Sequence, residues 1–240
     1  MAEYIDAPSP NHDDRPGNPD MIVLHYTGMK TGAEALARLR DPEAKVSSHY
    51  LIEEDGQTYR LVFDSRRAWH AGVSSWAGQS GLNDCSIGIE IVNPGHEWGY
   101  RAFPDAQMKA VEHLVADLIR RHEIRLSRVI GHSDIAPTRK EDPGELFDWR
   151  RLAQAELAIW PVAADEEGAG RLLDPEGVAT LSHALAASGY ELQDFAATLT
   201  AFRRRFRPNA LSGVPVMRDL LIAREIATRW PADLGLAPVS

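Results

Sequence analysis

Short continuous runs of apolar residues are the first regularity along the chain. Residues 21–24 form one such run and residues 86–92 a second, in which Glu90 is the single acid. Runs of this length and composition are typical of strands that are buried on both faces. Residues 129–131 have the same character and predict a third, shorter strand.

A hairpin is predicted between the first two of these strands. Two strand-like segments, residues 49–52 and 58–62, lie on either side of Asp55 and Gly56. Glycine accepts the positive φ that a tight hairpin turn requires, so this arrangement favours a hairpin. Residues 68–84 are rich in glycine, alanine, serine and tryptophan, and we interpret them as a long loop.

Helical periodicity accompanies these strands. Residues 33–39 predict a short helix that ends near Pro42, and Pro104 and Asp105 open a longer one. Strands and helices mixed in this way predict a mixed sheet flanked by helices, of the α+β or α/β class. The longer helix carries one apolar stripe at three- and four-residue steps, formed by Met108, Val111, Val115 and Leu118.

The pattern changes near residue 161. Residues 161–170 have no apolar period, and only helical periodicity follows them, which predicts a linker and a small all-α domain that folds as a unit. Four prolines among residues 1–20 predict an extended arm that packs on the main domain. The predicted division is an arm 1–20, a main domain 21–160, a linker 161–172 and a three-helix domain 173–240. The apolar stripes of the three helices are Val178, Leu181 and Leu185, then Phe195, Leu199, Phe202 and Phe206, then Val216, Leu220, Ala223 and Ala227.

Composition and charge exclude several classes of protein. The 240 residues are 44% hydrophobic and 25% charged, which is ordinary globular usage and not that of a disordered chain. The formal net charge of −9 argues against general nucleic-acid binding. A single cysteine, Cys85, excludes an intramolecular disulfide and a cysteine-rich zinc finger.

The sequence also bears on location and assembly. No stretch approaches the roughly 20 apolar residues that a membrane span needs, and the first residues contain no secretory signal. We therefore expect a cytoplasmic protein, or a periplasmic one if this sequence lacks its leader. We expect a monomer.

Two histidines and an acid lie where functional groups gather in sheet proteins. His25 and His132 each end a predicted strand, and Asp142 follows ten residues after His132. Strand ends are where sites collect in such folds. Two histidines and a carboxylate with one open position form the pattern of a catalytic zinc site. The alternative is that Asp142 caps a turn before Pro143.

Glu90 and Lys140 are the candidate catalytic residues. A carboxylate inside an apolar strand is costly unless it is paired, so Glu90 is either a general base with a raised pKa or the partner of an arginine. Lys140 stands two residues before Asp142. Turned inward, its ammonium stabilises an oxyanion; turned outward, it is a solvated lysine.

Several segments together resemble the type 2 N-acetylmuramoyl-L-alanine amidases. This zinc family includes the amidases of bacterial peptidoglycan recycling and is related to phage-lysozyme-type amidases and peptidoglycan recognition proteins. The resemblance covers roughly residues 8–160 and implies their fold. It rests on Leu24-His25-Tyr26-Thr27-Gly28, Ser48-His49-Tyr50-Leu51-Ile52, Ser86-Ile87-Gly88-Ile89-Glu90, Gly131-His132-Ser133-Asp134-Ile135-Ala136-Pro137, Arg139-Lys140-Glu141-Asp142-Pro143-Gly144 and Phe147-Asp148-Trp149.

The resemblance supplies roles for these positions. It implies that His25, His132 and Asp142 are the zinc ligands of a catalytic domain, residues 21–160. Glu90 is then the catalytic acid and base, and Lys140 polarises the scissile carbonyl or holds the oxyanion. Some relatives carry a catalytic tyrosine where this sequence has Ser48, and Cys85 is at no ligand position. The proposed substrate contacts of the long loop are Trp69, His70, Trp76 and Asn83.

The last third resembles the small helical peptidoglycan-binding domain of some members. That likeness is carried by Gly189 and Tyr190, by residues 202–208 and by the last helix. The arginines Arg203, Arg204, Arg205 and Arg207 could contact an acidic glycan-peptide. The alternatives are that these arginines form a solvated face and that the helices only pack on the catalytic domain.

The predicted function is zinc-dependent hydrolysis of the amide bond between N-acetylmuramic (or anhydro-muramic) acid and the L-alanine of the stem peptide, in peptidoglycan turnover and recycling. The partners are peptidoglycan fragments or murein. One alternative is a non-catalytic peptidoglycan-recognition module, and another is a zinc endopeptidase acting on the same stem peptide.

Overall fold

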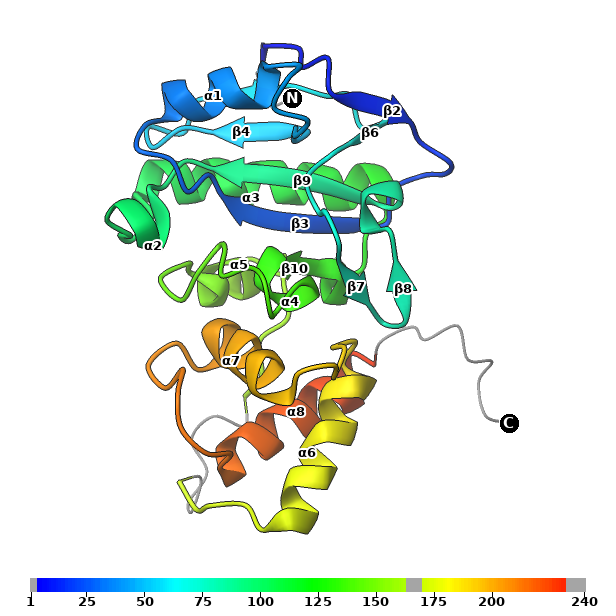
Figure 1. Ribbon diagram of the computed structural model, residues 1–240, viewed down its shortest axis with the longest axis vertical. Helices are drawn as coiled ribbons and strands as arrows, with labels where there is room; N and C mark the ends of the chain where they lie inside the picture. Colours follow the sequence, from blue (N-terminus) through cyan, green and yellow to red (C-terminus); the bar gives the residue numbers. More distant parts are fainter. Residues whose placement is uncertain (1–3, 163–169, 232–240) are drawn as a thin grey trace.

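A six-stranded mixed sheet forms the centre of the larger part of the molecule (Figure 1). The computed structural model describes residues 4–162 and 170–231. Most of the predicted linker, together with residues 1–3 and 232–240, lies outside the described residues. The strand order is β1-β5-β4-β9-β3-β10. The strands are β1 Ile5–Asp6, β3 Met21–Tyr26, β4 Tyr50–Ile52, β5 Thr58–Arg60, β9 Ser86–Ile91 and β10 Val129–Gly131.

The four strands β4, β9, β3 and β10 run parallel, and β5 runs antiparallel to β4. The predicted hairpin is confirmed, with Gly56 at a φ of +90° in its turn. The predicted arm contains β1 and β2, His12–Asp14, which pair with β5 and with β6, Arg66–Ala68. The segment interpreted as one long loop instead contains a small hairpin, β7 Ser75–Trp76 with β8 Gln79–Ser80, and the 3₁₀ turn η1, Leu82–Asp84.

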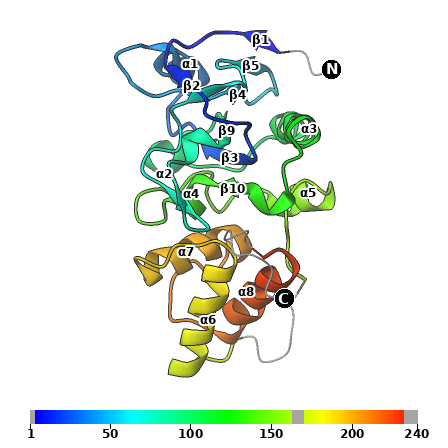
Figure 2. The same cartoon turned by 90° about the vertical axis from the view of Figure 1, so that its right-hand side faces the viewer.

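The two faces of the sheet differ in what covers them. Helices α3, Asp105–His122, and α5, Trp149–Gln154, lie on one face of the sheet (Figure 2). On that face Ile87, Ile89 and Ile91 pack against the stripe of α3. The alternate residues of β9, among them Gly88 and Glu90, therefore point to the other face. That face carries the candidate site. The remaining short elements of this part are α1 Gly32–Arg40, α2 Gly95–Trp98, η2 Leu126–Arg128 and α4 His132–Ile135.

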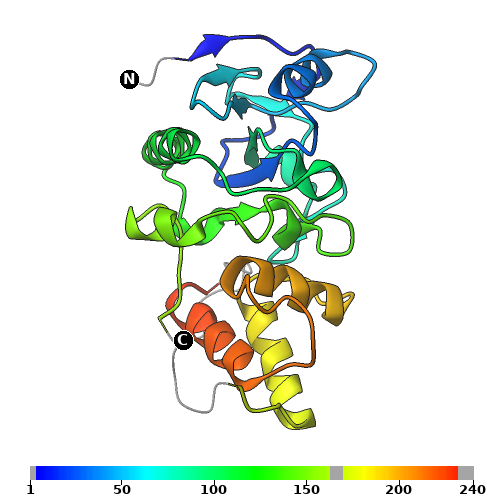
Figure 3. The same ribbon diagram turned by 90° about the vertical axis from the view of Figure 1, so that its left-hand side faces the viewer.

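Three helices follow in the last third, as the periodicity predicts, and they stack below β10 and α4 (Figure 3). They are α6 Pro175–Ala187, α7 Phe195–Phe206 and α8 Met217–Arg229. Asp174 caps α6 by accepting from the N–H of Gly177. No helix within the described ranges is long and apolar enough to cross a membrane.

The helical part and the sheet share one hydrophobic core, which the linker-like sequence does not indicate. Met21 and Ile130 of the sheet belong to the same buried cluster as Phe202 and Tyr190 of the helical part. The ring of Trp76 lies edge-on to that of Tyr190, with centroids 4.9 Å apart. The helical part is thus packed on the sheet domain over an apolar surface.

The arginine run of α7 is an internal contact and not an exposed binding face. Arg203, Arg204 and Arg205 are 2%, 7% and 3% exposed. Arg203 pairs with Asp219 within the helical part, and Arg204 reaches Glu141 of the sheet domain at 3.2 Å. The interpretation of these three residues as a solvated or glycan-binding face is therefore wrong.

Arg205 makes the most enclosed of these contacts. Its guanidinium donates to the Oδ2 atom of Asp134 at 3.1 Å and to the carbonyl of Val129, and it lies over the ring of Trp149. Asp134 is 1% exposed and also accepts from the hydroxyl of Tyr190. The helical part therefore neutralises a buried acid in α4, the helix that begins at His132.

We expect Arg205→Met to destabilise the protein by about 3–5 kcal/mol, because the buried carboxylate of Asp134 then loses its compensating charge. Arg120→Met is the matched control, since Arg120 is exposed on α3 and pairs with half-buried Asp117, which also pairs with Arg121. Surface pairs of this kind contribute about 0–1 kcal/mol. Chemical denaturation of both variants measures the difference. Equal losses in the two variants would contradict the role of Arg205.

Candidate active site

The parallel strands bring three of the predicted residues to one edge of the sheet. The register of β3 and β9 places His25 beside Glu90. Gly131, the last residue of β10, pairs with Leu24, so His132 follows at the level of His25. Because the carboxyl ends of parallel strands meet at one edge, residues far apart in the sequence gather there.

His25, His132 and Asp142 converge on one point. The Nδ1 atoms of the two histidines are 2.9 Å apart, and each lies 3.0 Å from the Oδ2 atom of Asp142. All three side chains are buried. The backbone N–H of Ser133 donates to the carbonyl of Asp142 at 2.8 Å, which ties the two ligand-bearing segments together. The carboxylate of Asp142 thus faces the imidazoles, as the metal hypothesis expects.

The hydrogen bonds of His132 direct one ring nitrogen at the cluster and the other away from it. Its Nε2 atom lies 3.1 Å from the backbone carbonyl of Ala71. A carbonyl only accepts, so Nε2 carries a proton, and in the neutral imidazole Nδ1 then presents a lone pair. That lone pair faces the carboxylate of Asp142 at 3.0 Å. Two acceptors this close are unfavourable unless a proton or a metal ion lies between them, and two imidazoles with one carboxylate are a ligand set that zinc accepts.

The protonation states of His25 and Asp142 also favour the binding of a zinc ion. Burial and the neighbouring His132 lower the pKa of His25 to about 4. Burial raises the pKa of Asp142, but in the metal-free cluster the protons that His132 and His25 direct at this carboxyl outweigh burial and lower its pKa below the usual value. At neutral pH His25 is then neutral and Asp142 is charged, which are the forms that bind metals.

Glu90 and Lys140 line the same cavity, which has a volume of about 460 Å³. The Oε2 atom of Glu90 is buried without a hydrogen-bond partner, and no arginine pairs with this acid within residues 4–162 and 170–231. Burial and the charge of Asp142 raise the pKa of Glu90 well above its usual value, and Lys140 acts in the opposite direction. The cavity therefore holds a proton acceptor and a cation beside the metal ligands.

The four predicted substrate contacts divide into two pairs. Trp69 and His70 line the cavity. Trp76 is 4% exposed and packs against Tyr190 of the helical part, away from the cavity. Asn83 is buried, and its side-chain oxygen accepts from the backbone N–H groups of His70 and Ala71. Trp76 and Asn83 thus do not line the cavity, and the contact with substrate stays a prediction for all four residues.

The cavity also contains residues that the sequence analysis did not single out. Tyr26, Arg38 and Arg139 line it together with the predicted residues. Two of them are sequence neighbours of His25 and Lys140, and that adjacency is the signal that could have identified them. Ser48 is fully buried, and its hydroxyl donates to the carbonyl of Gly88 at 2.7 Å, so it does not take the place of a catalytic tyrosine.

Comparison with known proteins gives consistent relatives. The sequence profile of the N-acetylmuramoyl-L-alanine amidases matches residues 15–145. The N-acetylmuramoyl-L-alanine amidase AmiD of Escherichia coli (strain K12) is 36% identical over 234 residues, which cover 89% of this chain and 84% of that protein. The 1,6-anhydro-N-acetylmuramyl-L-alanine amidase AmpD of Citrobacter freundii is 38% identical over 171 residues, 63% of this chain and 89% of that protein.

A solved structure resembles both parts of this chain. It is the complex of E. coli AmiD with the substrate anhydro-N-acetylmuramic acid-L-Ala-D-gamma-Glu-L-Lys. It superposes with a TM-score of 0.79 at 32% sequence identity and covers 91% of this chain and 93% of its own. The likeness therefore extends beyond the sheet domain into the helical part.

Proposed function

This chain belongs to the N-acetylmuramoyl-L-alanine amidase family, and we propose that it holds one zinc ion between His25, His132 and Asp142. It is an amidase of peptidoglycan turnover that cleaves the bond between the muramic acid lactyl group and L-alanine. One observation carries the zinc proposal. Three acceptor atoms lie 2.9–3.0 Å apart in a buried cluster, and a carbonyl holds the proton of His132 on the far side of its ring.

Glu90 and Lys140 have separate roles in the hydrolysis. When bound, zinc supplies a Lewis acid that activates water and polarises a carbonyl at neutral pH. Glu90 accepts the proton of the attacking water and then delivers it to the departing amine of L-alanine. The ammonium of Lys140 stabilises the negative charge that develops on the carbonyl oxygen. The half-buried position of Glu90, with its Oε2 atom enclosed, supports this role, since its raised pKa lets it act as both base and acid.

The substrate proposed for this site is a soluble anhydro-muropeptide. Two observations support it: the cavity of about 460 Å³ and the anhydro-muramic peptide in the related AmiD complex. Mass spectrometry of the products tests the bond that is cleaved. An amidase releases the intact sugar and a peptide that begins with L-alanine, whereas an endopeptidase leaves L-alanine on the sugar. Binding without any product would instead identify a recognition module.

The division of the chain into arm, catalytic domain, linker and helical domain is also proposed. Wall binding by the helical part stays a prediction, and its arginine run is largely engaged elsewhere. Because the two parts share a core, the full chain is the right probe for this prediction. Co-sedimentation with insoluble sacculi, with and without excess soluble muropeptide, separates wall binding by the helical part from binding at the active site.

A further inference from the structure

His70 lies directly behind the ligand His25, on the side away from Asp142. We propose that His70 is a positioning residue of the metal site, which fixes the tautomer and the ring orientation of His25. The inference rests on the proposed zinc site. It concerns hydrogen bonds among this chain's own residues, so it can be tested in the metal-free protein.

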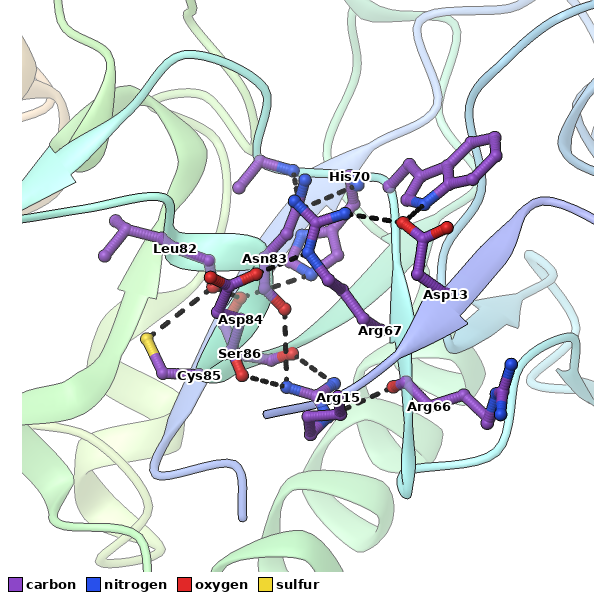
Figure 4. A network of polar contacts seen from close by, with 12 residues as sticks. Asp13, Arg15, Arg66, Arg67, His70, Leu82, Asn83, Asp84, Cys85 and Ser86 are labelled. Carbon is purple, nitrogen blue, oxygen red and sulfur yellow. Dashed lines mark hydrogen bonds and ion pairs between the residues drawn. The ribbon is translucent and has the colours of Figure 1, made fainter. Parts of the chain in front are cut away.

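The position of one proton follows from the contacts of Ser86. Its Oγ atom lies 2.5 Å from the carbonyl oxygen of Leu82, a distance that requires the hydroxyl to donate. The Nε2 atom of His70 lies 3.2 Å from the same Oγ. Because the only hydroxyl proton of Ser86 is used on Leu82, Nε2 of His70 must be the donor in this second contact. Figure 4 shows Leu82, Ser86 and His70 next to one another.

The second proton follows from the first. With its proton on Nε2, His70 presents a lone pair at Nδ1, which lies 3.1 Å from the Nε2 atom of His25. Nε2 of His25 is then the donor, and Nδ1 of His25 is left with a lone pair. That atom faces His132 and Asp142. The carbonyl of Leu82 thus sets the tautomer of His25 through two intervening side chains.

Both proposed histidine ligands donate their second ring N–H to a neighbour, but the acceptors differ. His132 donates directly to the carbonyl of Ala71, and His25 donates to His70. Histidines that bind metals usually donate their second ring N–H to a carboxylate, a carbonyl or water. The imidazole of His70 is neutral, so it brings no charge to this apolar strand. Its hydrogen-bond direction is set by the carbonyl of Leu82 through Ser86.

The neighbouring residues are arranged to hold the ring of His70. A Cβ atom at Gly88 would lie 2.4 Å from the Cγ atom of His70, so only glycine leaves room for this ring against β9. The side chain of Asn83 accepts from the backbone N–H of His70 at 3.1 Å. Alternate positions of β9 therefore provide the hydroxyl Ser86, the space at Gly88 and the acid Glu90.

The first test is the tautomer of each ring in the metal-free wild-type protein, measured by long-range ¹H–¹⁵N correlation at neutral pH. We expect a proton on Nε2 of both His25 and His70, and none on Nδ1 of His70. A proton on Nδ1 of His70, or a bare Nε2 on His25, would overturn the proposal. This measurement needs no variant, and its outcome does not depend on whether the protein hydrolyses muropeptides.

The second test compares variants by zinc affinity in competition with a chelator. His70→Phe keeps a ring but removes the acceptor, and we expect zinc affinity to fall by roughly 10- to 100-fold. His70→Asn retains an acceptor near the position of Nδ1 and should restore most of the affinity. His113→Phe, on the exposed side of α3, is the control. Unchanged affinity in His70→Phe would overturn the proposal, whereas absence of zinc binding in wild type would overturn the metal site itself.

Discussion

Replacing His132 by alanine is expected to remove the metal and the amidase activity together. The change deletes one of three ligand atoms and removes one of the two donors to the carbonyl of Ala71, the other being Arg139. Loss of the metal removes several kcal/mol of transition-state stabilisation, at least about 10³-fold in rate. Metal content by inductively coupled plasma mass spectrometry, measured with the rate on anhydro-muropeptide, checks this result.

His113→Ala is the matched control for this change, because His113 is an exposed histidine of α3. It should retain both zinc and activity. Full activity in the His132→Ala variant, or in wild type after complete removal of metal by EDTA, would show that the reaction does not depend on this site.

Glu90→Gln is expected to separate metal binding from catalysis. Glutamine preserves the volume of the side chain but cannot accept a proton at neutral pH. We expect zinc and fold to be retained and turnover to fall about 10²- to 10⁴-fold, the usual contribution of general acid–base catalysis. The unpartnered Oε2 atom of Glu90 in wild type means that the substitution breaks no ion pair.

Steady-state rates together with the thermal midpoint and zinc content measure this effect. Glu176→Gln, at the exposed start of α6, is a control for the loss of one acid. Near-normal turnover in Glu90→Gln would make Glu90 a structural residue and would require another proton acceptor in the cavity.

The strand-end residues were predictable because His25 and His132 each stand at the end of an apolar run. The apolar runs predict β3, β9 and β10 as buried strands. The structure shows that these strands run parallel, so their ends share one sheet edge. His25 and His132 stand at those ends, so their convergence follows from topology. Glu90 is visible for a related reason, because an acid among isoleucines has few structural uses.

The roles of Arg205 and Trp76 could not be predicted in this way. Arg205 pairs with Asp134, which is 71 residues away in the sequence, and Trp76 packs on Tyr190 across the shared core. An arginine run has the same sequence pattern whether it is solvated or buried. Only the docking of α7 against α4 decides between the two states, and that docking is a tertiary property.

The most direct test of the proposed metal centre is anomalous X-ray diffraction from crystals of the wild-type protein, recorded above and below the zinc absorption edge. We expect one strong zinc peak bounded by Nδ1 of His25, Nδ1 of His132 and Oδ2 of Asp142, the three atoms that lie 2.9–3.0 Å apart. A zinc peak elsewhere in the chain, or no peak in crystals of protein that hydrolyses muropeptides, would contradict it.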